Sequence, residues 1–337
     1  MRKHKAILME KKIIIISRTP LRITFVGGGT DIGRYYKERG PGAVISAAVN
    51  KYIYVTVHRR FDSTIRVSYS RTENVESVDQ LMHPTVREAL RLLDIDGGIE
   101  ITSMGDIPAG GTGMGSSSTF LVGLLNALHA WRGEYATAVQ LAEEAVRIER
   151  GILKEPGGKQ DQYIAALGGI QFMEFNRDET VVTTPLIMKE ESRKNLQDNL
   201  LLLYTGSQRR SAEIHERQSK DAGMHLESYD RMRDLAYSMF KSLVENRWDE
   251  TGRYLHENWL IKRTLADGIS SPAIDNYYKA AMENGATGGK LIGAGGSGFM
   301  LFFAPRGSHE AIRKALGLKA EPFEFETLGS RIIYVGD

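Results

Sequence analysis

The segment at residues 106–119, DIPAGGTGMGSSST, limits the possible folds more than any other, because four glycines and three serines stand directly before an apolar run at helical spacing. Glycines tolerate the positive φ angles that turn successive N–H groups toward one point. Residues 118–131 predict a helix whose open N–H groups and positive dipole end would face the same anion. The segment therefore predicts a phosphate-binding loop; the plainer alternative is a serine-capped helix after a glycine turn.

Composition excludes several classes of protein. The 337 residues are 42% hydrophobic, which is enough for a full core and for two lobes that share a cleft. Forty-four basic and 42 acidic residues leave a net charge of +2, without the positive excess expected of a nucleic-acid-binding protein. The chain has no cysteine, which excludes disulfides and thiolate metal sites and favours a cytoplasmic location. Its apolar runs are too short for a secretory signal or a membrane span, so no membrane partner is expected.

The rest of the chain predicts two mixed lobes. Strands are expected from β-branched runs at residues 13–18, 43–49, 52–59 and 64–69, and a helix from Pro84. A charged linker is expected at residues 189–198, followed by a strand, helices at 211–267 and 272–283, and a βαββ-like end. We therefore divide the chain into an N-terminal lobe, residues 1–185, and a C-terminal lobe, residues 186–337.

A second glycine cluster satisfies the G-x-G-x-x-G pattern at Gly293, Gly295 and Gly298. Residues 299–304 read as a strand, whereas a dinucleotide fingerprint needs a helix there. The HRD and DFG segments of protein kinases are missing, and Ser116 stands where a P-loop would have lysine. This cluster predicts a backbone packing point, which can still lie beside a ligand.

Two further groups of polar residues are candidates for a site. Residues 17–33, SRTPLRITFVGGGTDIG, set arginines on a strand before a glycine turn; there Asp31 is either the N-cap of a helix or a ligand-binding carboxylate. Glu149 and Asp161 flank a proline and glycine break. They are either solvated charges or, because Asp161 directly precedes an apolar helix, carboxylates that point into a cleft.

The order and approximate spacing of these pieces over residues 17–304 resemble the GHMP kinase family of small-molecule kinases. PLRITFVGGGTD is similar to the family's first motif, PAGGTGMGSSST to its second, GGKQDQ to the G-I-M-D-Q turn of galactokinase, and GAGGSG to its third. The resemblance implies an α+β two-lobe fold, with a ribosomal protein S5 domain 2-like N-terminal lobe and a ferredoxin-like C-terminal lobe. It also implies ATP and Mg²⁺ in the cleft between them.

The resemblance assigns roles residue by residue. Asp161 becomes the candidate base, with Arg22 beside it to favour the ionised acid and to balance charge on the transferring group. Ser117 and Glu149 become the magnesium ligands. The residues assigned to ATP are Pro108, Gly110, Gly111, Gly113, Met114, Gly115, Ser116, Ser117 and Ser118. Those assigned to the substrate are Arg18, Gly28, Gly29, Thr30, Asp31, Gly158, Lys159, Gly295 and Gly296.

Two departures from the family pattern concern the loop and the substrate. Four residues separate Pro108 from Gly113 where the pattern has three, so the loop carries one extra residue. The first motif has GGGTD where galactokinase has G-E-H-T-D, so two polar sugar contacts of galactokinase are absent and galactose is a poor candidate substrate.

Within the family, the first motif and the GGKQDQYIAALGG turn most resemble the bacterial D-glycero-D-manno-heptose phosphate kinases. This resemblance implies phosphorylation of the anomeric oxygen of D-glycero-D-manno-heptose 7-phosphate, giving the 1,7-bisphosphate used for nucleotide-activated heptose in surface polysaccharide. Candidate cations for the substrate's own phosphate are Arg18, Lys159, Lys290, Arg209 and Arg210, each of which is otherwise an ordinary surface charge.

Three alternatives stay open. The first is a kinase of fucose or another free sugar, the second a non-catalytic sensor of ATP and sugar, and the third a mevalonate-type kinase that acts on an acyclic acid. The expected partner is a small-molecule sugar phosphate. The sequence leaves the oligomeric state open, with a homodimer as one possibility.

Overall fold

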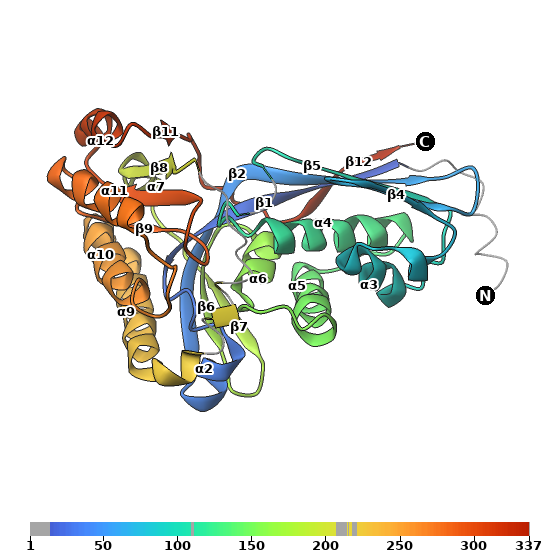
Figure 1. The fold of residues 1–337 in the computed structure, drawn as a ribbon, viewed down its shortest axis with the longest axis horizontal. Coiled ribbons are helices and arrows are strands. Elements are labelled where there is room, and N and C mark those ends of the chain that lie inside the picture. Colours follow the sequence, from blue (N-terminus) through green and yellow to red (C-terminus); the bar gives the residue numbers. More distant parts are fainter. Residues whose placement is uncertain (1–13, 109–110, 207–213, 215, 218–220, 337) are drawn as a thin grey trace.

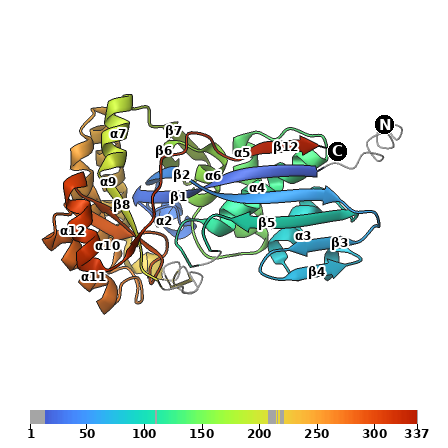
Figure 2. The same ribbon diagram turned by 90° about the horizontal axis from the view of Figure 1, so that it is seen from above.

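The computed structural model describes residues 14–108, 111–206, 214, 216–217 and 221–336. They form two lobes, each with a sheet and its own helices, arranged side by side along the long axis of the molecule (Figure 1). Seen from above, the larger sheet spans the N-terminal lobe, and helices of the C-terminal lobe gather at one end of it (Figure 2).

The N-terminal lobe is built on an eight-stranded sheet. Its strands are β1 (Ile14–Val26), β2 (Gly42–Arg59), β3 (Ile65–Ser68), β4 (Thr72–Val75), β5 (Ile99–Gly105), β6 (Ile170–Phe175), β7 (Val181–Pro185) and β12 (Arg331–Gly336). The main order is β12-β1-β2-β5-β3-β4, while β6 pairs with the first part of β2 and β7 pairs with β6. All pairs are antiparallel except β3 with β5.

Helices cover one face of this sheet (Figure 1). They are α3 (Pro84–Leu92), α4 (Ser116–Trp131), α5 (Ala138–Val146), the π-helical turn η2 (Arg147–Ile152) and α6 (Gln160–Leu167); α2 (Gly33–Glu38) and η1 (Val78–Gln80) are short. The apolar residues of α4 pack on β1 and β2, and Leu121, Val122, Leu124, Leu125 and Leu128 of that helix are all buried. The N-terminus of α4 is thereby fixed beside the middle of β1.

The C-terminal lobe has a four-stranded antiparallel sheet in the order β11-β8-β10-β9. Its strands are β8 (Leu200–Tyr204), β9 (Gly288–Leu291), β10 (Phe299–Phe303) and β11 (Lys319–Ala320). Its helices are α7 (Glu190–Asp198), α9 (Leu226–Val244), α10 (Thr251–Lys262), α11 (Pro272–Glu283) and α12 (His309–Leu316), with 3₁₀ turns η3 (Ala222–Met224), η4 (Trp248–Glu250) and η5 (Arg306–Ser308). Helices connect β8 to β9 and α12 connects β10 to β11, so the connectivity is ferredoxin-like, as predicted.

Several predicted elements have different bounds. The runs at residues 43–49 and 52–59 are one long strand, β2, and β1 extends to Val26. The prediction of a linker at residues 189–198 is wrong. Helix α7 occupies residues 190–198, and its Ser192 and Leu196 are buried. The helices expected within residues 211–267 are α9 and α10, with the turns η3 and η4; residues 211–213, 215 and 218–220 lie outside the described part.

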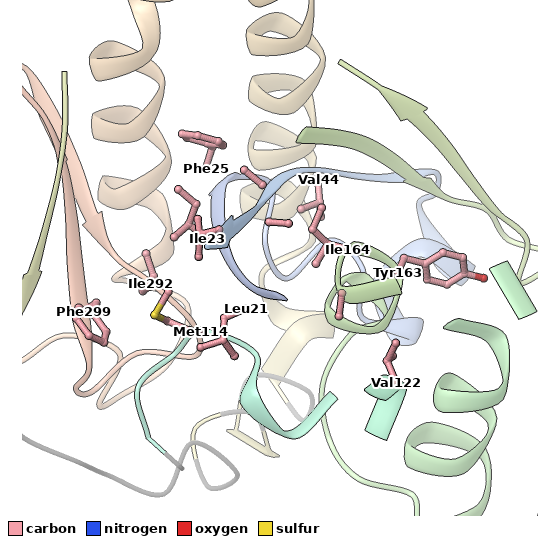
Figure 3. Packing of buried hydrophobic residues seen from close by; sticks show 14 of the residues in the cluster. Leu21, Ile23, Phe25, Val44, Met114, Val122, Tyr163, Ile164, Ile292 and Phe299 are labelled. Carbon is pink, nitrogen blue, oxygen red and sulfur yellow. The ribbon is translucent and has the colours of Figure 1, made fainter. Parts of the chain in front are cut away.

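The end of the chain returns to the first lobe. β12 pairs with β1 from Ile14 to Arg18, so residues 331–336 belong to the sheet of the N-terminal lobe. A division of the chain after residue 185 assigns these residues to the other lobe. Buried apolar residues of both lobes form one continuous core, and Figure 3 shows its part around Leu21, Met114 and Ile292, where the lobes meet. Within the described residues, no helix has the length and apolar character needed to cross a bilayer.

Candidate active site between the two lobes

The predicted phosphate loop runs directly into α4. Gly111, Gly113 and Gly115 have φ angles of +69°, +77° and +78°. Gly115 occupies the N-cap position of α4, and no side chain caps that helix end, so its first N–H groups remain available to an anion. Pro108 is exposed before the loop, and Gly110 lies outside the described residues.

The third motif of the sequence packs onto this loop from the C-terminal lobe. A Cβ on Gly293 would lie 2.3 Å from Gly113 Cα, and one on Gly298 would lie 2.4 Å from the carbonyl oxygen of Thr112. These glycines are therefore needed for close approach of two backbones, which is the packing role that the sequence predicts. Gly295, expected to bind substrate, packs against Ile269, whose carbonyl accepts a hydrogen bond from the N–H of Gly296, the other glycine expected to bind substrate.

Arg22 holds Asp161 beside the phosphate loop. The Nε and Nη2 groups of Arg22 donate to the two carboxylate oxygens of Asp161 over 2.8 and 2.7 Å. Arg22 also donates through Nη1 to the Gly113 carbonyl and through its backbone N–H to the Met114 carbonyl. A Cβ on Gly115 would lie 3.2 Å from Asp161 Oδ2. The Asp161 carboxylate therefore lies at the loop that would hold a phosphate. It is next to Gly115, which precedes Ser117 by two positions.

Ser117 and Glu149 fit a magnesium site. The Ser117 hydroxyl donates a hydrogen bond to Glu149 Oε1 over 3.2 Å, so the two oxygens are already close to the roughly 3 Å that separates neighbouring oxygens of an octahedral Mg²⁺ shell with about 2.1 Å bonds. Glu149 is 1% exposed, and its other oxygen accepts from Ser118 and Gln162, which leaves Oε1 to face Ser117. No cluster of three or more metal-binding side chains occurs among the described residues, but Mg²⁺ commonly completes its shell with water and phosphate.

A cavity of about 520 Å³, partly open to solvent, lies next to Asp161. Its lining comes from both lobes: Arg22, Thr24, Gly28, Gly29, Asp31, Ile32, Arg150, Gly157, Gly158, Gln160, Asp161, Lys262 and Gly293. Its lining is rich in charged and hydrogen-bonding groups, which suits a polar ligand.

Asp31 is fixed in this cavity and is not a helix cap. Its carboxylate accepts hydrogen bonds from the Gly29 N–H over 2.9 Å and from the backbone and side-chain amides of Gln160 over 3.1 and 3.2 Å, whereas Ile32 takes the N-cap position of α2. Thr24 and Ser46 in turn donate to the Gln160 side-chain carbonyl. Burial raises the pKa of Asp31; the bonds from Gln160 and Gly29 oppose that rise, and nearby Asp161 adds to it.

Four residues expected to bind substrate have other partners. The Thr30 hydroxyl bonds to both backbone groups of Ala43. The Arg18 guanidinium lies 4.4 Å above the Tyr52 ring, and Lys159 pairs with Glu179. Lys290 is 1% exposed and donates to the carbonyl of Phe25. The other expected cations, Arg209 and Arg210, lie outside the described residues.

Sequence reasoning missed four polar residues of the cavity. Thr24 lies in PLRITFVGGGTD and Gln160 lies in GGKQDQ, so their positions next to the glycines and Asp161 could have indicated that they belong to the site. Arg150 follows Glu149 directly and donates to the Gly158 carbonyl over 2.9 Å. Lys262, at the end of α10, is in none of the motifs, and only the packing of the C-terminal lobe brings it here.

These features define a class of protein. A glycine loop at a helix N-terminus, a carboxylate held beside it and a polar cavity between two α+β lobes make this chain a small-molecule kinase. The family models for the GHMP kinases N-terminal domain and the GHMP kinases C-terminal domain match residues 81–169 and 239–321. The chain belongs to the GHMP kinase family, whose members use ATP.

Individual relatives agree with this assignment. The chain is 31% identical over 323 residues to the D-glycero-alpha-D-manno-heptose 7-phosphate kinase of Campylobacter jejuni, covering 90% of this chain and 93% of that protein. A crystal structure described as a D-glycero-D-manno-heptose 1-phosphate kinase from Bacteroides thetaiotaomicron superposes with a TM-score of 0.79 at 26% identity, covering 96% of this chain and all of the other. A bifunctional fucokinase/GDP-fucose pyrophosphorylase of Arabidopsis thaliana is 23% identical over 85% of this chain but only 29% of its own length.

Proposed function

We propose that this kinase transfers the γ-phosphoryl group of ATP to the anomeric hydroxyl of D-glycero-D-manno-heptose 7-phosphate, giving the 1,7-bisphosphate. The observation that carries the kinase chemistry is the Arg22–Asp161 pair, which lies both at the phosphate loop and on the wall of the cavity. The choice of heptose is supported by the likeness to the Campylobacter jejuni enzyme.

Asp161 is the proposed base. Both carboxylate oxygens accept from Arg22, and because a carboxylate oxygen can accept more than one hydrogen bond, the same group can also accept from the acceptor hydroxyl. As the hydroxyl oxygen forms its bond to the γ-phosphorus, the proton passes to Asp161 and the bond to the bridging oxygen of ADP breaks. Arg22 keeps the carboxylate ionised beforehand and balances charge next to the transferring group.

The phosphates of ATP would be held by the loop at Gly111–Gly115 and the first N–H groups of α4. Ser117 and Glu149 would hold Mg²⁺, which supplies positive charge to the phosphate oxygens. Asp31 would accept a hydrogen bond from a sugar hydroxyl, since Gln160 fixes its direction from the other side.

The test is an ADP-release assay over a panel of acceptors. The panel contains D-glycero-D-manno-heptose 7-phosphate, the corresponding 1-phosphate, free heptose, fucose, galactose and mevalonate. The two heptose phosphates are separated because the two named relatives differ in the position of the phosphate. We expect kcat/KM to be highest for the 7-phosphate, with ³¹P NMR showing a new signal coupled to the anomeric proton.

Other results would redirect the proposal. A preference for the 1-phosphate would overturn the anomeric site of transfer, and a preference for fucose would favour a free-sugar kinase. A preference for mevalonate would exclude a sugar substrate. Tight ATP binding without turnover of any acceptor would make the chain a sensor.

A further inference from the structure

Lys262 lines the cavity, but it belongs to none of the sequence motifs and has no role in the function proposed above. It is the last residue of α10 in the C-terminal lobe, is 5% exposed and lines the cavity together with Arg22 and Asp161. A buried ammonium group is costly unless it is paired. Its position in a polar cavity therefore calls for a partner.

The described contacts leave Lys262 only partly satisfied. Its Nζ donates to the carbonyl oxygen of Gly293, and an ammonium has three N–H groups to offer. Gly293 is the residue of the third motif that packs on Gly113 of the phosphate loop. The hydrogen bond therefore fixes the ammonium close to the point where the two glycine turns meet.

Four charged residues outside α10 surround Lys262. They are Arg22 on β1, Asp31 after β1, Asp161 on α6 and Lys290 on β9. Burial, with a smaller contribution from Arg22, lowers the pKa of Lys262 to about 8, and Asp31 and Asp161 act in the opposite direction. An additional anion in the cavity would favour the charged form.

Two anions could supply this charge, the group being transferred or a phosphate already on the sugar. Asp161 marks where the acceptor hydroxyl must lie, and Gly113 marks the phosphate loop. Lys262 interacts with Asp161 and Arg22 and is bonded to the turn that touches Gly113. A phosphate at the opposite end of a seven-carbon sugar lies several bonds away from that hydroxyl.

We propose that Lys262 is a catalytic residue whose ammonium group contacts the transferring phosphoryl group from the C-terminal lobe, opposite Arg22. The proposal rests on the kinase function proposed above but not on the identity of the sugar. The bonds that form and break are those of the phosphoryl transfer described above. Lys262 keeps its proton throughout and stabilises negative charge on the phosphoryl oxygens.

Steady-state kinetics give the first test, with Lys262→Met as a neutral variant of similar length. We expect kcat to fall on the order of 10²-fold with every acceptor that the unmodified enzyme uses, while KM for the acceptor changes less than about threefold. The matched control is Arg263→Met, because Arg263 is the next residue and pairs with Asp275 outside the cavity. A rise of KM confined to phosphorylated sugars, with kcat unchanged, would overturn the proposal and assign Lys262 to the substrate's phosphate.

The pH profile gives a second reading. In the unmodified enzyme, kcat/KM for ATP should fall as the pH rises above about 8, because the fraction of charged Lys262 falls. Lys262→Arg should move this fall to higher pH, and Lys262→Met should remove it. A decline of the same size and midpoint in Lys262→Met as in the unmodified enzyme would contradict the proposal.

A binding experiment without turnover separates this proposal from the choice of sugar. Calorimetric titration with Mg·ATP at pH 8, in buffers of different ionisation enthalpy, should show uptake of roughly half a proton when no acceptor is present. Mg·ADP, which lacks the transferring group, should show no such uptake, and neither should Lys262→Met with Mg·ATP. Uptake on addition of sugar phosphate alone, or equal uptake by Lys262→Met with Mg·ATP, would refute the assignment whatever the acceptor panel shows.

Discussion

At the scale of single residues, Arg22 decides what Asp161 can do. A guanidinium that binds both carboxylate oxygens fixes the plane and the direction of the carboxylate. The same arginine reaches the Gly113 carbonyl, so the base and the phosphate loop are held by one side chain. A lysine could not hold the base in this way, because its ammonium has no planar pair of donors.

The first prediction concerns the base itself. Asp161→Asn removes the proton acceptor but keeps the size of the side chain, so kcat should fall by about 10²–10⁴-fold with little change in KM for ATP. Stopped-time ADP assays measure this loss, and circular dichroism checks the fold. Asp249→Asn is the control, since Asp249 is an exposed carboxylate on η4, away from the cavity. Activity within tenfold of the unmodified enzyme would remove Asp161 as the base.

The second prediction uses a glycine whose role is steric. A Cβ on Gly158 would lie 1.8 Å from Asp31 Oδ2, so Gly158→Ala must displace the carboxylate or the turn that carries Gln160. We expect KM for the sugar to rise at least about tenfold, because a displacement near 1 Å is enough to disrupt a positioned site. Titration calorimetry should show unchanged binding of Mg·ATP. Gly307→Ala is the control, because a Cβ there meets nothing within 4 Å, and an equal effect of both changes would contradict this account.

The residues of the candidate site differed in how far the sequence could predict them. Gly113, Ser117 and Asp161 stand in local patterns whose chemistry is readable from spacing, and the structure brings them together. Lys262 is the last residue of α10 and stands outside every glycine motif, and a lysine at such a position usually faces solvent. Its position depends on how α10 packs against the first lobe, which no local pattern encodes.

At the scale of elements, α4 and α5 are joined by a buried histidine between two acids. His129 Nε2 lies 2.8 Å from Glu144 and Nδ1 lies 3.4 Å from Glu134. The hydrogen bond to Glu144 raises the pKa of His129, and the field of both acids adds to it against the effect of burial. The N-terminal end of α4 carries the phosphate loop, so this contact supports the helix that forms the nucleotide site.

The third prediction follows from the sign of that shift. The folded protein binds the His129 proton more tightly than the unfolded chain does. The stabilisation of the fold by charged His129 is therefore fully present below about pH 6.5 and is lost as the pH rises through the raised pKa. His129→Gln should lower the free energy of unfolding at pH 6 by about 1.5–3 kcal/mol and by less at pH 9. Urea unfolding at both values measures the difference, with His58→Gln as control. A loss that grows with pH would contradict the assignment.

Elements were predictable where one local pattern decides them. α3 begins at the expected Pro84, and β10 follows the second glycine cluster because Phe299–Phe303 is uniformly apolar and buried. α7 was missed, since its charged sequence has only Ser192 and Leu196 to bury and its helical state depends on the surface beneath it. The merging of two runs into β2 also depends on partners, because β1, β5 and β6 all pair with that strand.

At the scale of the whole molecule, the lobes are fixed to each other by more than the site. The Gly27 N–H donates to Asn258 of α10 over 3.0 Å, and Lys290 of β9 donates to the Phe25 carbonyl over 3.0 Å. Both contacts are buried and join the end of β1 to the C-terminal lobe. The two lobes should therefore unfold together, although each has its own sheet.

The fourth prediction tests that cooperativity through the returning end of the chain. Phe325 forms a bridge with Val49 and lies 6.3 Å from the Phe25 ring, and Ser330 bonds to Thr19 just before β12. A chain that ends at Glu321 loses these contacts and two buried phenylalanines, worth about 3–6 kcal/mol. Calorimetry should show one transition for the full chain and one transition at lower temperature for the shortened chain, because β1 then has an open edge beside the site. Phe325→Ala should give a smaller shift in the same direction. Two separate transitions in the full chain would show that the lobes unfold independently. A shortened chain in which only one lobe is destabilised would show the same, and β12 would then only cover the edge of β1.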